Sequence, residues 1–237
     1  MPDFPRFTPL LRASALGLAL LAPLAQAHQA GDFIIRAGAA TTAPHEDSGN
    51  LKLDGAKVAG TKATLDSDTQ LGLALAYMFA DHWGVELLAA TPFQHTVGVH
   101  GVSAATGVPG LDGKLATVKQ LPPTLSLQYY PMAPTSALQP YAGVGLNYTF
   151  FYGEDLSGAR RQEGFSNLKL KDSVGLAGQL GVDYMLTDHL LLNASVWYVD
   201  IGTKASVDGP TALGVGRTKV DVDVDPWVYM VGLGYRF

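Results

Sequence analysis

Cysteine is missing from all 237 residues, so the sequence offers neither a disulfide nor a thiolate ligand for a metal. Basic residues are also few: 16 Lys and Arg stand against 21 Asp and Glu, a formal net charge of −5. Because nucleic-acid binding needs basic side chains that neutralise phosphates, this balance argues against nucleic acid as a partner. Phosphate-loop, nucleophile-elbow and zinc-ligand motifs are lacking too. The sequence therefore predicts no catalytic site, no metal site and no cofactor.

The N-terminus is organised like an export signal. Arg6 and Arg12 precede an uncharged apolar run over residues 13–24, which is closed by small residues ending at Ala27. The run is shorter than the roughly 20 residues that a helix needs to cross a bilayer. We therefore predict a signal peptide at 1–27, removed near Ala27, and a single mature domain at 28–237. A retained N-terminal anchor is the alternative.

Beyond this segment no apolar run has the length of a transmembrane helix, so a membrane-spanning chain would have to cross as strands. Apolar residues instead alternate with small or polar ones, a period of two that indicates strands with one apolar face. Eight segments show it: 32–40, 70–79, 83–90, 124–129, 142–150, 174–184, 192–199 and 228–237. The pattern predicts an all-β fold, an eight-stranded antiparallel transmembrane β-barrel with a tight interior.

The connections between these segments distinguish a barrel from a soluble β-sandwich, which also alternates. Short connections at 80–82, 131–139 and 187–189 alternate with long polar ones at 41–68, 98–120, 152–171 and 202–219. A barrel with short periplasmic turns and four long extracellular loops requires this order, whereas a sandwich does not. The barrel is therefore favoured over the soluble alternative.

Aromatic residues gather at the predicted periplasmic ends of the strands, where an interfacial girdle belongs. They are Phe33, Tyr77, Phe79, Trp83, Tyr129, Tyr130, Tyr184, Tyr235 and Phe237. The last two close an alternating run that ends on a terminal phenylalanine. Tyr235 and Phe237 resemble the assembly signal of outer-membrane barrels, which makes the barrel assembly machinery an expected partner.

Several blocks together resemble the OmpW family of small outer-membrane β-barrels, which includes AlkL-like proteins. They are VELLAATPF at 85–93, LPPTL at 121–125, PYAGVGLNYT at 140–149, SVWY at 195–198 and DPW at 225–227. The resemblance covers essentially the whole mature chain but departs in the first long loop and at 101–113. It implies a barrel in the outer membrane, surrounded by lipid and lipopolysaccharide, that takes up small, mostly apolar molecules without enzymatic activity.

Four charged residues fall on the inward face near the periplasmic end: Arg36, Glu86, Asp183 and Arg236. An eight-stranded barrel is barely wide enough for its own side chains, and unpaired charges inside it would cost several kcal/mol each. We therefore predict that the four form a charge cluster that plugs the lumen. Two interpretations stay open: the cluster closes a straight aqueous path, or it merely fills and stiffens the barrel.

Higher on the same inward face, Leu88 and Trp197 interrupt a run of small and polar neighbours, with Phe93 above them. These three residues are the candidate ligand pocket, although plain space filling explains them equally well. Apolar residues of the flanking loops extend the pattern into a funnel: Val97, Val99, Val102, Val108, Phe165, Leu168 and Val215. The expected ligands are small apolar solutes.

Prolines on two neighbouring strands suggest a way out of this pocket. Pro92 and the pair Pro122 and Pro123 lie at similar heights on the third and fourth strands. Each removes a backbone donor from the ladder, so the seam between the strands should be weak there. We hypothesise a lateral exit into the membrane at this seam; rim bulges without a passage are the alternative.

Other constellations leave two further function classes open. Asp221, Asp223 and Asp225 alternate near the outer rim and could hold a cation, although a solvated acidic edge explains them as well. A lipid-modifying barrel enzyme would need His95 or His100 beside loop serines Ser103 or Ser166, which the sequence does not support. A structural or adhesive barrel that binds through its long loops is the other alternative to uptake.

Overall fold

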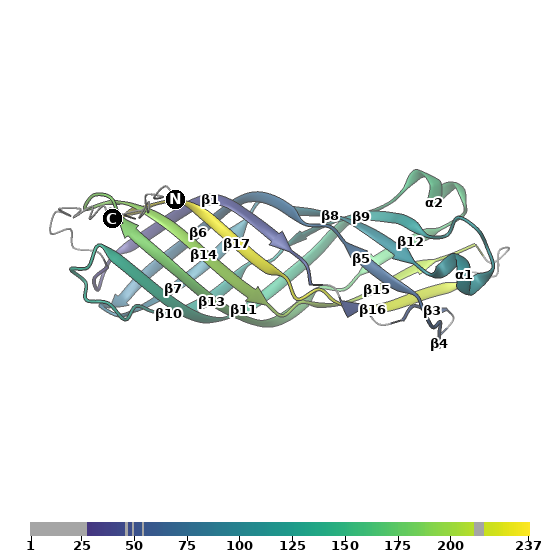
Figure 1. Cartoon of the computed structure of the whole chain (residues 1–237), viewed down its shortest axis with the longest axis horizontal. Coiled ribbons are helices and arrows are strands. Elements are labelled where there is room, and N and C mark those ends of the chain that lie inside the picture. The colour runs from purple at the N-terminus through teal and green to yellow at the C-terminus, as the bar shows by residue number, and fades with distance from the viewer. Residues whose placement is uncertain (1–27, 46, 49, 54, 211–215) are drawn as a thin grey trace, which may run out of the picture.

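The computed structural model describes residues 28–45, 47–48, 50–53, 55–210 and 216–237, so the predicted signal peptide and Val215 lie outside the described residues. Eight strands form a closed wall, each antiparallel to its neighbours (Figure 1). In chain order they are β1 (Phe33–Ala43), β6 (Asp68–Ala80), β7 (Trp83–Ala90), β10 (Thr124–Tyr129), β11 (Leu138–Leu156), β13 (Ser173–Met185), β14 (Leu190–Val199) and β17 (Trp227–Arg236). β1 pairs with β17 to close the ring, with Ala37 opposite Leu233. The predicted eight-stranded barrel is confirmed.

The two faces of this wall divide as the alternation predicts. Large apolar side chains point outward: Val144 is 69% exposed and Val174 is 70% exposed. Aromatic residues also point outward at the strand ends opposite the predicted periplasmic girdle, where Tyr198 packs against Trp227. Tyr130 is an exception to the predicted girdle, because it is fully buried and points into the lumen.

Each of the four long connections contains strands, although their composition suggested polar loops. They contain β2 (Asp47–Ser48), β3 (Lys52–Leu53), β4 (Ala56–Lys57), β5 (Lys62–Leu65), most of β9 (Gly113–Leu121), β12 (Ser166–Leu170), β15 (Gly202–Asp208) and part of β16 (Arg217–Asp223). β8 (Phe93–His100) joins β5 and β9 here, and β11 continues into the same region. Together they extend the barrel well beyond its eight-stranded part, as the right half of Figure 1 shows. We call this part the extension.

Two short helices lie in the extension, α1 (Val102–Thr106) and α2 (Gly158–Gln162). Among the described residues, no helix is both long and apolar enough to cross a membrane. Sequence analysis did not predict these strands, because each one is short and polar turn residues separate them.

Barrel closure requires glycine where β1 meets β17. Gly38 and Gly232 are register partners, and a Cβ atom on Gly232 would lie 2.1 Å from the carbonyl oxygen of Ala37. Backbone atoms cannot move away from such a contact without breaking the ladder. The first and last strands therefore approach closely because both lack a side chain at this level.

We expect Gly232→Val to lower the free energy of unfolding by about 1–3 kcal/mol, the usual cost of overpacking. Gly178→Val is the matched control, because a Cβ on Gly178 meets nothing within 4 Å. Urea unfolding of both variants in lipid vesicles measures the difference. Equal unfolding midpoints for the two variants would contradict this account of closure.

Candidate functional site

A charged group lies inside the barrel, and Arg36 is at its centre. Its guanidinium donates to Glu86 at 2.6 Å through Nη1 and to Asp183 at 3.0 Å through Nε. Nη2 donates to a second oxygen of Asp183 and to the hydroxyl of Tyr130. The side chains of Arg36, Glu86 and Asp183 are each at most 1% exposed. The three strands that carry them, β1, β7 and β13, are brought together only by closure of the ring.

Neutral polar side chains complete the hydrogen bonding of both carboxylates. Gln179 donates to Glu86 at 2.8 Å, while Asn193 donates to Asp183 at 2.8 Å. His28 lies 2.8 Å from the other oxygen of Asp183. A buried ion pair is tolerated only when its remaining hydrogen-bonding capacity is satisfied in this way. We call Arg36, Glu86, Asp183 and these neighbours the charge cluster.

The fourth predicted member has a different carboxylate partner. Arg236 pairs with Asp32 at 3.2 Å and donates to the backbone carbonyl of Asp188. It therefore ties the end of β17 to the segment before β1 and to the turn before β14. Placing Arg236 in the cluster was wrong. Inward parity tells which face of a strand a residue lies on, but it does not give the position of that residue along the barrel axis, because the strands tilt. Parity also failed to find Tyr130, which follows the end of β10.

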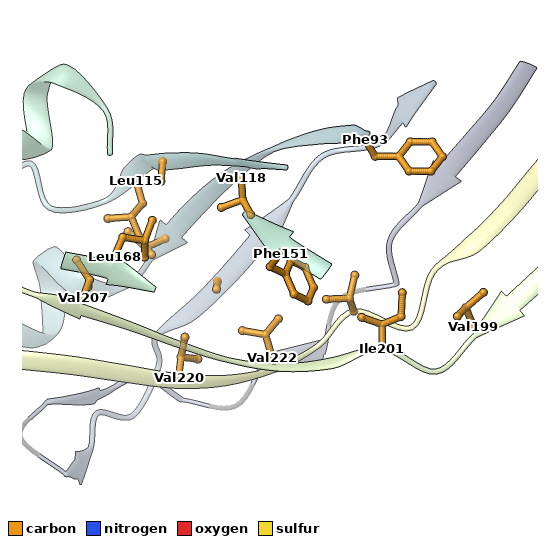
Figure 2. Close-up of a cluster of buried hydrophobic side chains, with 14 of the residues drawn as sticks. Phe93, Leu115, Val118, Phe151, Leu168, Val199, Ile201, Val207, Val220 and Val222 are labelled. Carbon is orange, nitrogen blue, oxygen red and sulfur yellow. The ribbon is translucent and has the colours of Figure 1, made fainter. Parts of the chain in front are cut away.

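An apolar cavity of about 80 Å³ lies in the extension. It is lined by residues from all four long connections, among them Leu51, Val102, Leu168 and Val207. Figure 2 shows side chains of the buried hydrophobic cluster around this cavity. They come from several strands and converge on a common interior. Of the funnel residues, Val97, Val99, Val102, Phe165 and Leu168 line the cavity, and Val108 packs against the same cluster. We call it the upper cavity.

The predicted pocket residues lie below it. Leu88 and Phe93 line a smaller cavity of about 20 Å³, which we call the lower cavity. Trp197 is buried in the same apolar cluster and is the register partner of Val228, which lines the lower cavity. Sequence analysis missed the walls that β15 and β16 give the upper cavity. Alternation of Thr203, Ala205 and Val207 was the available signal.

One further lining residue was unexpected. Arg160 of α2 is buried beside the upper cavity, and its guanidinium donates to the carbonyl oxygens of Gly110 and Asp112. It also pairs with Glu163 at 2.7 Å. These bonds fasten α2 to the loop before β9. Arg160 therefore holds α2 against the wall of the cavity, and its charge is paired with Glu163.

The barrel wall is interrupted at the predicted proline seam. The β7–β10 ladder ends with Leu88 opposite Thr124, and pairing resumes only with Phe93 opposite Gln120. Residues 89–92 and 121–123 lie between these pairs and have no register partner across the seam. Each strand stays attached on its other side, because Thr91 donates to Leu71 and Tyr148 donates to Pro123. Both strands thus keep a hydrogen bond to the neighbour on their other side at this level.

The rim aspartates have separate partners. Asp221 accepts hydrogen bonds from Lys52 at 2.8 Å and Lys204 at 2.9 Å, which lower the pKa of Asp221 to about 2. Asp225 accepts from the backbone of Ile201, whereas Asp223 is exposed. Lysines thus satisfy part of the predicted acidic edge.

Two of the residues considered for lipid chemistry, His95 and Ser103, form local hydrogen bonds. His95 hydrogen-bonds through Nδ1 to the backbone carbonyl of Asp66, and Ser103 accepts from the backbone of Asp112.

At the other end of the molecule, Tyr235 and Phe237 are 45% and 65% exposed, and their rings are 4.7 Å apart. The predicted assembly signal is thus an outward aromatic edge on the last strand.

Known proteins match this chain along nearly its whole length. The model of the OmpW family matches residues 29–237. Outer membrane protein W of Vibrio cholerae serotype O1 is 44% identical over 233 residues, which cover 96% of this chain and 100% of that protein. The crystal structure of OprG from Pseudomonas aeruginosa is 65% identical, covers 90% of this chain and 98% of its own, and gives a TM-score of 0.85. AlkL of Ectopseudomonas oleovorans is 26% identical over 87% of this chain and 83% of its own.

Removal of one carboxylate tests the charge cluster. We expect Glu86→Ala to lower the free energy of unfolding by about 3–5 kcal/mol, because Arg36 then loses a buried partner. In planar bilayers the variant should also conduct ions more readily than the wild type. Asp155→Ala is the control, because its pair with Arg161 is exposed on both sides and should contribute less than about 1 kcal/mol. A steady, wide conductance in the wild type would show that the cluster does not block the lumen.

Proposed function

Because this chain belongs to the OmpW family and is a bacterial outer-membrane barrel, we propose that it carries small, mostly apolar molecules from the cell exterior into the outer membrane. The observation that carries the proposal is the interruption of the wall at residues 89–92 and 121–123, directly beside a buried cavity. Transport is passive and needs no catalytic residue or cofactor.

The upper cavity supports the entry step. Its lining is almost entirely aliphatic and aromatic, so a molecule enters by exchanging water for apolar contacts. Each buried methylene gains about 0.8 kcal/mol on such a transfer. Because four separate connections form the walls, the shape of the cavity depends on the extension as a whole. An apolar solute is favoured there over water.

The charge cluster supports a route that does not run through the barrel. Below Leu88 and Trp197 the lumen is occupied by Arg36, Glu86, Asp183 and their hydrogen-bonding neighbours, which are buried and mutually paired. An apolar molecule moving down would have to separate these charges without replacing their partners. Such a step costs several kcal/mol, so the floor directs the solute sideways.

The proline seam supplies the sideways path. Ala89, Ala90 and Pro122 belong to the unpaired segments and also line the lower cavity. No ladder pairs join the two strands beside this cavity at that point. We propose that solutes leave here into lipid, where their apolar surface remains buried. Pro92, Pro122 and Pro123 keep the seam open because they cannot donate to a ladder.

The two ends of the chain complete the proposal. We infer that residues 1–27 direct export and are removed near Ala27, and that Tyr235 and Phe237 present the last strand to the barrel assembly machinery. The outward aromatic and aliphatic residues then contact lipid and, on the outer side, lipopolysaccharide.

Crosslinking across the seam tests the exit. The natural sequence has no cysteine, so Ala90→Cys with Leu121→Cys can be joined by a short bifunctional thiol reagent without competing sites. We expect the joined protein to lose most uptake of a labelled alkane, measured as an initial rate in whole cells against cells lacking the protein. Cleavage of the reagent should restore uptake.

The matched control joins Val85→Cys to Leu127→Cys, a register pair on the same two strands where the ladder is intact. This crosslink should leave uptake unchanged. Unchanged uptake in the seam-joined protein would exclude lateral exit between these strands.

A further inference from the structure

Polar atoms without protein partners gather around the lower cavity. Both amide atoms of Gln120 and the hydroxyl of Thr42 are buried and have no hydrogen-bond partner among the described residues. Gln120 is fully buried and Thr42 is 1% exposed, and both line this cavity. Buried polar groups in folded proteins are normally satisfied, so a set of unsatisfied ones at one place indicates a binding function.

A third residue with such an atom lies close by. The indole Nε1 of Trp197, which is 1% exposed, has no partner in the described part of the chain. Trp197 pairs in register with Val228, a lining residue of the lower cavity. Together the three side chains offer an amide with a donor and an acceptor, a hydroxyl that does both, and an indole donor. We call them the polar ring.

We propose that the polar ring receives the head group of an amphipathic solute at the point where the solute turns towards the seam. The inference rests on the proposed function and names its substrate class: apolar molecules that carry one small, neutral hydrogen-bonding group, such as a hydroxyl. A neutral head is required because every lining residue in the described chain is uncharged, so an ionic head would be buried without a counter-charge.

The dimensions suit a head group and not a whole molecule. A volume of about 20 Å³ holds roughly one water-sized group. The apolar chain is assigned to the upper cavity of about 80 Å³, whose apolar lining belongs to the same hydrophobic cluster as Leu88 and Phe93. In Figure 2, Phe93, Val199 and Ile201 mark the lower cavity, while Leu115, Val207 and Val220 mark the upper one.

The polar ring changes the rate of passage through desolvation. A hydroxyl that enters an apolar cavity loses its hydrogen bonds to water, which slows entry. The amide of Gln120 and the hydroxyl of Thr42 replace those bonds, so the desolvation penalty is smaller at the narrowest part of the route. A plain alkane has nothing to desolvate and gains nothing from the ring.

A comparison of two probes separates this inference from the proposed function. 1-Nonanol and n-decane have the same number of non-hydrogen atoms and differ in the terminal hydroxyl. Initial uptake of each labelled probe is measured in cells with and without the protein, and the readout is the nonanol-to-decane ratio. Gln120→Met keeps the length of the side chain while removing its polar atoms, and Thr42→Val does the same for the hydroxyl.

We expect each variant to lower the ratio, by roughly tenfold where a buried hydrogen bond to the solute is lost. Gln94→Met is the matched control, because Gln94 is an exposed glutamine on β8, the strand that pairs with β9 beside Gln120, and its substitution should leave the ratio unchanged.

An unchanged ratio in both variants, with both probes still entering, would overturn the polar ring and leave lateral uptake intact. Equal losses of both probes also leave the ratio unchanged and overturn it. If neither probe enters faster through the wild type than in cells without the protein, the proposed function itself is wrong.

Discussion

The narrow interior of an eight-stranded ring is the constraint on which the remaining structure depends. Such a ring has room for its own side chains and little else, so each inward residue must be small, paired or packed. Gly38 and Gly232 satisfy the constraint by lacking a side chain, whereas Arg36, Glu86 and Asp183 satisfy it by binding one another. Space for a solute therefore lies above the charge cluster, in the lower cavity and in the larger upper cavity of the extension.

The membrane-embedded half was predictable because lipid imposes a simple rule on it. Outward residues must be apolar and inward ones cannot all be, so alternation in segments such as 174–184 recorded both face and strand identity. The extension follows no such rule, since its outer face meets water and its strands are short. β15 and β16 consequently read as polar loop, although Val207, Val220 and Val222 point into a common core.

The candidate site residues of the membrane-embedded part were likewise easier to predict than those of the extension. Parity along single strands brought Arg36, Glu86 and Asp183 together correctly in geometry, and proline chemistry pointed to a seam that the ladder does interrupt. Position along the barrel axis was harder, because strand tilt shifts residues by amounts that depend on register. Arg236 was misplaced for that reason. Leu51 and Arg160 were beyond reach, because their neighbours come from four distant connections.

The buried ions of the charge cluster also bear on how the barrel forms. Arg36 lies 147 residues before Asp183 and 50 before Glu86, so its partners arrive from opposite sides of the ring. An open sheet would hold the guanidinium against apolar neighbours with one carboxylate or none, at a cost of several kcal/mol. Partly zipped intermediates are thus penalised and the closed ring is rewarded. Folding becomes cooperative, because the ion pairs that occupy the lumen form only when all eight strands are in place.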